Sequence, residues 1–301
     1  MAPLLLIAAL LGGAWLWTPD EDRAALESRY AAPPSTFVNM AGLRLHVRDT
    51  GPRDGPALIL LHGFASSLHT WEPWAQNLSD KFRVVRIDLP GAGLTGADPT
   101  GDYSDARGVH ILLELMDQLG IDRATLVGHS MGGRLAWRFA AKQPQRVSRL
   151  VLVAPDGFAS PGFEYGKAPE VTAPVRLMQY VLPRALLRMT LAPAYANPSL
   201  MSDETVDRYW HLMRAPQVRT ALIARMQQMV LQDPAPLLAR INAPTLLLWG
   251  EQDAMIPVAN AQDYLRAMKN ARLVTLPGVG HLPHEEAPAA GLPAVRSFLN
   301  E

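Results

Sequence analysis

The 301-residue chain has no cysteine, no net charge and no internal repeat. Without cysteine it can form neither disulfide bonds nor thiolate metal sites, and a cysteine nucleophile is excluded. Lysine plus arginine and aspartate plus glutamate both number 28, so no excess of one sign points to nucleic acid as a partner. His-x-x-x-His spacing and carboxylate clusters are missing as well, and we expect neither a metal ion nor a cofactor.

Charged side chains are also missing from residues 1–19. Leu4–Leu11 is a continuous apolar run, Trp15 and Trp17 follow it, and Asp20 ends it. Three interpretations stay open: a membrane anchor, a cleaved signal peptide, or a hydrophobic helix packed on the domain. The first two predict a membrane-anchored or exported protein that can associate with a membrane through residues 1–19. The third predicts a cytoplasmic protein.

Short apolar runs alternate with helical patterns over most of the remaining chain. Ala57–Leu61 is uninterrupted and apolar, as in a buried parallel strand, whereas Asp105–Leu119 repeats apolar residues at helical spacing. This alternation predicts an α/β fold with a mostly parallel sheet and helices on both faces. Between Asp156 and Pro236 the pattern becomes helical without a clear strand, which predicts an inserted helical cap.

These patterns divide the chain into four parts. Residues 1–19 are the hydrophobic segment, and residues 20–35, with Pro33 and Pro34, form a linker. The core combines residues 36–155 with residues 237–301, and residues 156–236 form the cap.

A Gly-x-Ser-x-Gly motif, Gly128-His129-Ser130-Met131-Gly132, lies between an apolar run and a helical pattern. The run before it, Ala124–Val127, is strand-like, and Arg134–Lys142 after it is amphipathic. Because glycine has no Cβ, the strand and the helix can approach each other closely around the serine. The motif therefore predicts an exposed, nucleophilic Ser130 on a strained turn.

The chain resembles the α/β-hydrolase family over roughly residues 36–299. The resemblance is carried by five motifs in the family's order: His62-Gly63-Phe64, Asp88-Leu89-Pro90-Gly91, the Ser130 motif, Trp249-Gly250-Glu251-Gln252-Asp253, and Gly280-His281. It implies the family fold, a lid over the site and a catalytic triad of Ser130, Asp253 and His281. The backbone N–H groups of Phe64 and Met131 would form the oxyanion hole.

The sequence offers two candidates for the acid of this triad. Asp156 also follows a strand end, where some family members place the acid, so it stays open as an alternative to Asp253. We prefer Asp253 because Gly-x-x-Asp after a strand that ends in tryptophan is the commoner family pattern.

The resemblance implies a serine-dependent hydrolase that cleaves carboxylic esters through an acyl-enzyme, acting on a small apolar ester. Epoxide hydrolases and haloalkane dehalogenases place an aspartate where this chain has Ser130, so Ser130 argues against both activities. Carbon–carbon bond hydrolases, lactonases and perhydrolases keep the serine and stay open, although the first usually have tryptophan where this chain has Leu282. A non-catalytic binding protein is a further alternative. The expected walls of the substrate pocket are Phe64, Met178, Met189, Trp210 and Met213.

Overall fold

A computed structural model describes residues 16–301 of the chain. Most of the hydrophobic segment predicted over residues 1–19 therefore lies outside the described residues. Among residues 16–301, no helix has both the length and the apolar composition needed to cross a membrane.

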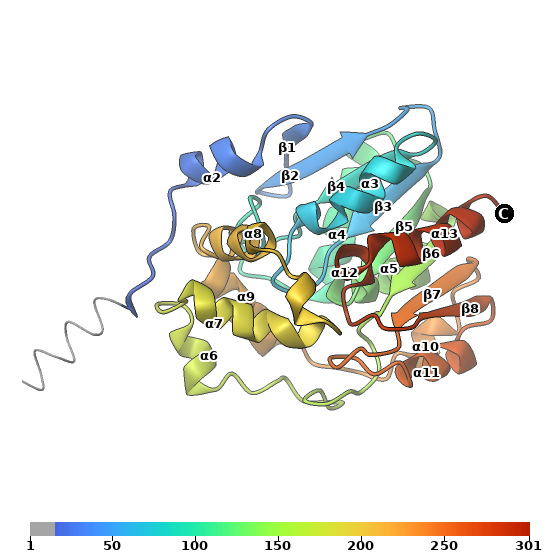
Figure 1. Cartoon of the computed structure of the whole chain (residues 1–301). Coiled ribbons are helices and arrows are strands. Elements are labelled where there is room, and N and C mark those ends of the chain that lie inside the picture. The colour runs from blue at the N-terminus through green and yellow to red at the C-terminus, as the bar shows by residue number, and fades with distance from the viewer. Residues whose placement is uncertain (1–15) are drawn as a thin grey trace, which may run out of the picture.

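Eight strands form one sheet in the order β1-β2-β4-β3-β5-β6-β7-β8 (Figure 1). Their bounds are Ser35–Met40 (β1), Leu43–Thr50 (β2), Ala57–Leu61 (β3), Arg83–Ile87 (β4), Ala124–His129 (β5), Val147–Val153 (β6), Thr245–Gly250 (β7) and Ala271–Leu276 (β8). β1 pairs with β2, and β2 with β4, in antiparallel fashion, whereas all other neighbours are parallel. The carboxyl ends of β3 to β8 consequently meet at one edge of the sheet, where ligands bind in open α/β sheets.

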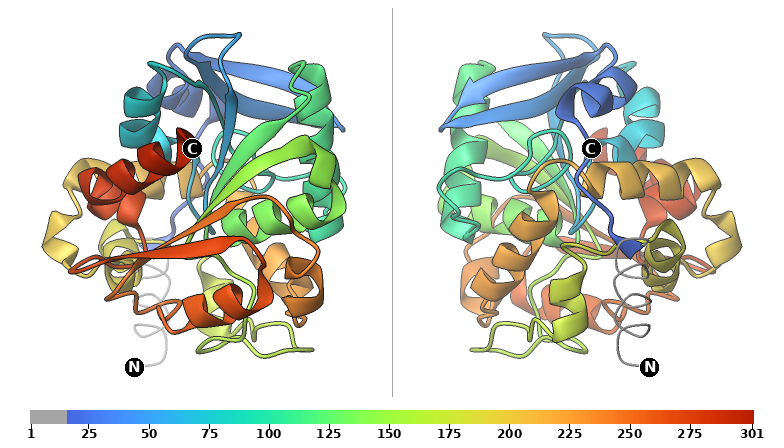
Figure 2. Two further views of the ribbon diagram at one scale, coloured as in Figure 1. Left: turned by 90° about the vertical axis from the view of Figure 1, so that its right-hand side faces the viewer. Right: turned by 90° about the vertical axis from the view of Figure 1, so that its left-hand side faces the viewer.

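Helices cover both faces of this sheet (Figure 2). One face carries α3 (Glu72–Leu78), α12 (Pro283–Glu286) and α13 (Pro288–Leu299), and the other carries α4 (Asp105–Gln118), α5 (Met131–Lys142), α10 (Ala235–Leu238) and α11 (Asn260–Ala267). Successive strand residues point to opposite faces, so Leu58 and Leu60 enter one core whereas Ile59 and Leu61 enter the other. The predicted fold class is thus confirmed.

The long connection between β6 and β7 contains α6 (Ala173–Leu177), α7 (Arg184–Leu191), α8 (Asp203–Met213) and α9 (Val218–Gln228). These helices gather beside the sheet (Figure 1), and Leu182, Leu187 and Leu212 from this connection form a small hydrophobic core together with Leu26 and Leu94. The arrangement fits the helical cap predicted over residues 156–236, and we call α6 to α9 the cap helices.

The linker predicted over residues 20–35 is partly helical. Helix α2 covers Arg23–Tyr30, and the Asp22 carboxylate caps it by accepting a hydrogen bond from Ala25 N at 2.9 Å. Leu26 is 1% exposed and packs into the core of the cap helices. This segment is therefore bound to the cap helices instead of crossing solvent.

Candidate active site

Ser130 lies on a strained turn between β5 and α5. Its backbone has φ 50° and ψ −118°, and residues other than glycine rarely adopt a positive φ of this kind. The turn is held from the next strand, because Ser130 N donates to Val153 O and Asp156 N donates to Ser130 O, both at 3.0 Å. Hydrogen bonds to β6 and to the loop that follows it thus hold the strained conformation in place.

The glycines on either side of Ser130 allow this close approach. A Cβ at Gly128 would lie 2.4 Å from Gly132 O, and a Cβ at Gly132 would lie 2.2 Å from Leu61 O in β3. Neither position can hold a larger residue unless the backbone moves.

His281 and Asp253 are hydrogen-bonded at the ends of neighbouring strands. His281 follows β8, Asp253 follows β7, and His281 Nδ1 lies 2.7 Å from Asp253 Oδ2. The other carboxylate oxygen accepts from Met255 N at 2.8 Å and from Ile256 N at 2.9 Å. Because both Asp253 oxygens are occupied, the carboxylate is fixed in place and can hold the imidazole in one orientation.

Asp156 lies near Ser130 but has a different partner. Its carboxylate is 3.5 Å from Arg134 Nη1. Burial raises the pKa of Asp156, and the Arg134 guanidinium opposes that shift. The structure therefore places Asp253, and not Asp156, against the His281 ring.

A cavity of about 270 Å³ opens over the serine. Its lining residues are Phe64, Ser130, Met131, Asp156, Ser160, Pro161, Phe163, Arg225, Met226, Met229, Ala254, Met255, Ile256 and His281. Met131 is the first residue of α5, so its N–H has no acceptor within the helix and lies at the positive end of the helix dipole. Phe64 and Met131 thus border the cavity that holds Ser130 and His281.

Four of the expected pocket walls lie elsewhere. Met213 is buried in the core of the cap helices, Met178 and Trp210 pack against that core, and Met189 is 70% exposed. Trp210 and Met213 lie on α8, an amphipathic helix whose apolar face packs into this core and not on the cavity. Phe64 is the one expected wall residue in the cavity lining.

Besides Met131, the methionines that line the cavity are Met226 and Met229, at the end of α9, and Met255. Met255 lies two residues after Asp253 in the sequence, and this proximity to the expected acid could have identified it as a wall residue. Nothing in the sequence separates Met226 and Met229 from the other methionines of the predicted cap.

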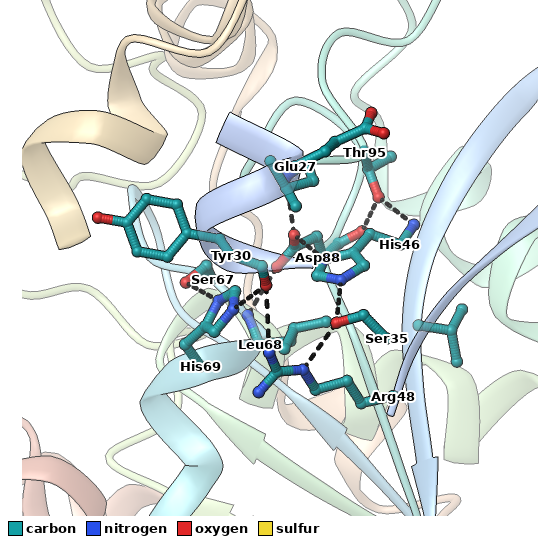
Figure 3. Close-up of polar contacts among 12 residues, drawn as sticks. Glu27, Tyr30, Ser35, His46, Arg48, Ser67, Leu68, His69, Asp88 and Thr95 are labelled. Carbon is teal, nitrogen blue, oxygen red and sulfur yellow. Dashed lines mark hydrogen bonds and ion pairs between the residues drawn. The ribbon is translucent and has the colours of Figure 1, made fainter. Parts of the chain in front are cut away.

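A buried network around Asp88 joins the loops after β3 and β4 to β2 (Figure 3). Asp88, at the end of β4, accepts from Leu68 N at 2.7 Å and from Leu94 N at 2.8 Å, and its Oδ2 lies 2.7 Å from His46 Nδ1. Burial would raise the pKa of Asp88, but the neighbouring His46 and its hydrogen bond hold that pKa far below its ordinary value.

The network contains a second serine–histidine–aspartate arrangement, because His46 Nε2 lies 2.9 Å from Ser35 Oγ. Ser35 Oγ also accepts a hydrogen bond from Arg48 Nε at 2.9 Å. His46 and Asp88 are both 0% exposed, so no substrate reaches them. The arrangement is structural, and it ties β1 and β2 to the loop after β4.

Comparisons with known proteins support the fold described above. The sequence profile described as alpha/beta hydrolase fold matches residues 56–288. A 2-hydroxy-6-oxo-6-phenylhexa-2,4-dienoate hydrolase of Burkholderia cepacia is 30% identical and is covered over 88% of its length by 81% of this chain. Epoxide hydrolase 3 of Xenopus tropicalis is 28% identical, with 96% of this chain and 84% of that protein covered. The crystal structure of a hydrolase from Pseudomonas aeruginosa PA01 is 29% identical, with a TM-score of 0.78 over 90% of this chain and 100% of that chain.

Proposed function

The chain belongs to the alpha/beta hydrolase fold family and is a hydrolase, and from that premise we propose that it cleaves carboxylic esters through a Ser130 acyl-enzyme. The observation that supports this most strongly is the cavity shared by Ser130 and His281, with His281 hydrogen-bonded to Asp253 behind it. A serine on an elbow turn, a histidine base and a buried carboxylate are the parts that acyl transfer requires.

In the proposed reaction, His281 Nε2 takes the proton of Ser130 Oγ as the oxygen attacks the ester carbonyl carbon. Asp253 stabilises the imidazolium that forms, and the N–H groups of Met131 and Phe64 bind the oxyanion of the tetrahedral intermediate. The intermediate collapses as the imidazolium gives its proton to the leaving alcohol. A water molecule, deprotonated by His281, then hydrolyses the acyl-enzyme and frees Ser130.

The test compares the wild type with Ser130→Ala on p-nitrophenyl esters of increasing acyl length. We expect kcat to fall by roughly 10⁵–10⁶, leaving only the rate that the oxyanion hole and binding provide. A fluorophosphonate probe should label the wild type and not the variant. Ser297→Ala, an exposed serine on α13, is the matched control. Substantial activity in folded Ser130→Ala would remove the serine from the mechanism.

Carbon–carbon bond hydrolysis is the second candidate. It is favoured by the 30% identity to a hydrolase whose name specifies a phenylhexadienoate substrate. Leu282, directly after His281, departs from the tryptophan that is usual in such enzymes. A vinylogous diketone assayed beside the esters decides between the two, because faster cleavage of the diketone than of every ester would establish the second candidate. A lactone in the same panel tests ring opening.

We also propose that residues 1–19 associate with a membrane. At the start of the described residues, Trp17 is 55% exposed and stacks on Tyr180, with 5.6 Å between the ring centroids; Tyr180 is itself 50% exposed. Such amphipathic rings are enriched at membrane interfaces. Fractionation of the full-length protein is the test. Recovery in the membrane fraction supports the proposal, whereas a soluble protein with Met1 intact contradicts it. A soluble exported form without the first residues would replace the anchor by a cleaved signal peptide.

A further inference from the structure

Arg225 places a guanidinium in the wall of the cavity that holds Ser130 and His281. It extends from α9, and its Nη2 donates a hydrogen bond to Pro90 O, 2.5 Å away, in the loop after β4. The guanidinium carbon also lies 5.0 Å from the centroid of the Tyr103 ring. These contacts fix the position of the guanidinium, but neither partner is an anion.

The carboxylates near Arg225 are already paired with other arginines. Asp105 lies 2.7 Å from Arg134 and 2.9 Å from Arg138, and Asp156 lies 3.5 Å from Arg134. Within residues 16–301, no carboxylate oxygen comes within 4.0 Å of Arg225. Asp98, whose charge also acts on Arg225, lies 2.8 Å from Arg107. Each of these carboxylates is thus held by another arginine, and Arg225 has no ion-pair partner of its own in the part of the chain that the structure describes.

Two other arginines of the cap helices, the partly buried Arg208 and the buried Arg219, do have acidic partners. Arg208 lies 2.9 Å from Glu285, and Arg219 lies 2.7 Å from Asp20. Burial lowers the pKa of Arg225 to about 10, so the side chain is still protonated at neutral pH. Arg225 is partly buried, and withdrawing an unpaired charge from water is costly unless a ligand supplies the opposite charge.

We propose that Arg225 binds an anionic oxygen group, a carboxylate or a phosphate, on the substrate whose carbonyl Ser130 attacks. The proposal rests on the proposed ester hydrolysis and narrows its substrate class. Met226, Met229 and Ile256 make much of the remaining lining apolar. The fitting substrate is therefore an ester with an apolar body and one anionic end, which a planar guanidinium can bind through two parallel hydrogen bonds.

The experiment uses p-nitrophenyl esters with the same six-carbon acyl chain. One chain ends in a methyl group (hexanoate), one in a carboxylate (the adipate monoester) and one in a phosphate (6-phosphonooxyhexanoate). For the wild type we expect a higher kcat/KM for at least one anionic ester than for hexanoate, and the better anion identifies the source. Arg225→Met should lower the ratio of anionic to neutral kcat/KM by about ten- to a hundredfold. Arg225→Lys should give a ratio between those of the wild type and Arg225→Met, because lysine keeps the positive charge but lacks the planar guanidinium with its two parallel N–H donors.

Arg240→Met, an exposed arginine just after α10, is the matched control and should leave the ratio unchanged. The proposal is overturned if the wild type does not prefer either anionic ester, or if Arg225→Met changes all three esters equally. If the wild type hydrolyses no ester, the proposed function fails, and calorimetry then tests Arg225 alone. Ser130→Ala should bind adipic acid monoamide more tightly than hexanamide, and a second substitution, Arg225→Met, should abolish that difference. Equal binding of the two amides would contradict the proposed anion site at Arg225.

Discussion

Two aspartates near Ser130 differ in what their carboxylates contact. Asp253 Oδ2 lies 2.7 Å from His281 Nδ1, whereas Asp156 faces Arg134 at 3.5 Å. An acid that contacts the imidazole selects its tautomer and stabilises its charged form, whereas an acid paired with an arginine does neither. The two carboxylates therefore have separable roles even though both follow a strand of the same sheet.

Replacing each aspartate by asparagine tests this difference. Asp253→Asn should lower kcat by about 10⁴, because the amide holds the wrong tautomer of His281. Asp156→Asn should cost far less, since it removes a partner of Arg134 and not of His281. Steady-state kinetics on one ester, with circular dichroism to check folding, measures both. A larger loss for Asp156→Asn would assign the acid to the end of β6.

At the residue scale, the sequence predicts reactive groups better than pocket walls. Ser130, Asp253 and His281 each lie in a local motif just after a strand, and the parallel order of the strands brings those motifs together. Trp210 and Met213 lie on the amphipathic helix α8, and which neighbour its apolar face packs against is set by tertiary contacts. Sequence periodicity contains no information on that choice.

At the scale of elements, the unit that matters most for the site is the turn from β5 into α5. It packs against β3 so closely that a Cβ on Gly132 would lie 2.2 Å from Leu61 O and 2.5 Å from His62 O. These obstacles are backbone atoms, which cannot rotate away as a flexible side chain would.

Gly132→Ala should therefore destabilise the fold by about 2–4 kcal/mol and displace Ser130, with loss of activity. The matched control is Gly120→Ala. Gly120 lies in the turn after α4, at φ 64°, and a Cβ there would meet nothing within 4 Å. The control should lose only about 1 kcal/mol from its left-handed backbone. Urea unfolding measures both changes, and equal losses would show that steric contact at the elbow is unimportant.

The limits of a buried strand were easier to predict from the sequence than those of the last helices. β3 begins and ends where its apolar run does, because a strand buried on both faces has no polar positions to blur its limits. The sequence of residues 285–299 predicts a single helix, but the structure divides this stretch between α12 and α13, with the break at Ala287. Pro288 has no N–H to continue a helix but suits the first turn of a new one.

At the scale of the whole molecule, several buried histidines make folding sensitive to acid. Burial lowers the pKa of His69 to about 4, and burial also lowers the pKa values of His62, His129 and His284. In the unfolded chain these rings would titrate near 6.5. Below that pH the unfolded state binds more protons than the native state, so acid favours unfolding.

The free energy of unfolding should thus be nearly constant above pH 6.5 and should fall as the pH is lowered toward 4. His69 alone contributes a loss of about 3 kcal/mol over that range, which follows from the displacement of its pKa. Urea titrations at pH 7.5 and pH 5 measure the change, and His69→Gln should reduce the difference between the two. Equal stability at both values would mean that the buried rings are protonated in the native state.

The last prediction concerns where the folded protein begins. The sequence predicts a linker over residues 20–35, whereas the structure binds this segment to the cap helices. Asp20 lies 2.7 Å from Arg219, Glu21 lies 2.7 Å from Arg214, and Leu26 is buried. Removing the segment would expose apolar surface and leave Arg219, 5% exposed, without its acidic partner.

A chain that begins at Leu16 should keep the melting temperature and kcat/KM of the full-length protein, because it retains every one of these contacts. A chain that begins at Ala31 should melt about 5–10 °C lower, since several kcal/mol of packing and ion pairing are lost from a domain of this size. Its kcat/KM should fall as well, because α9, which carries Arg225 and Met226 into the cavity wall, packs in the same core as Leu26. Differential scanning fluorimetry and ester kinetics on the two chains make the comparison. Identical melting temperatures would restore the simpler view that residues 16–30 only connect the hydrophobic segment to an independent domain.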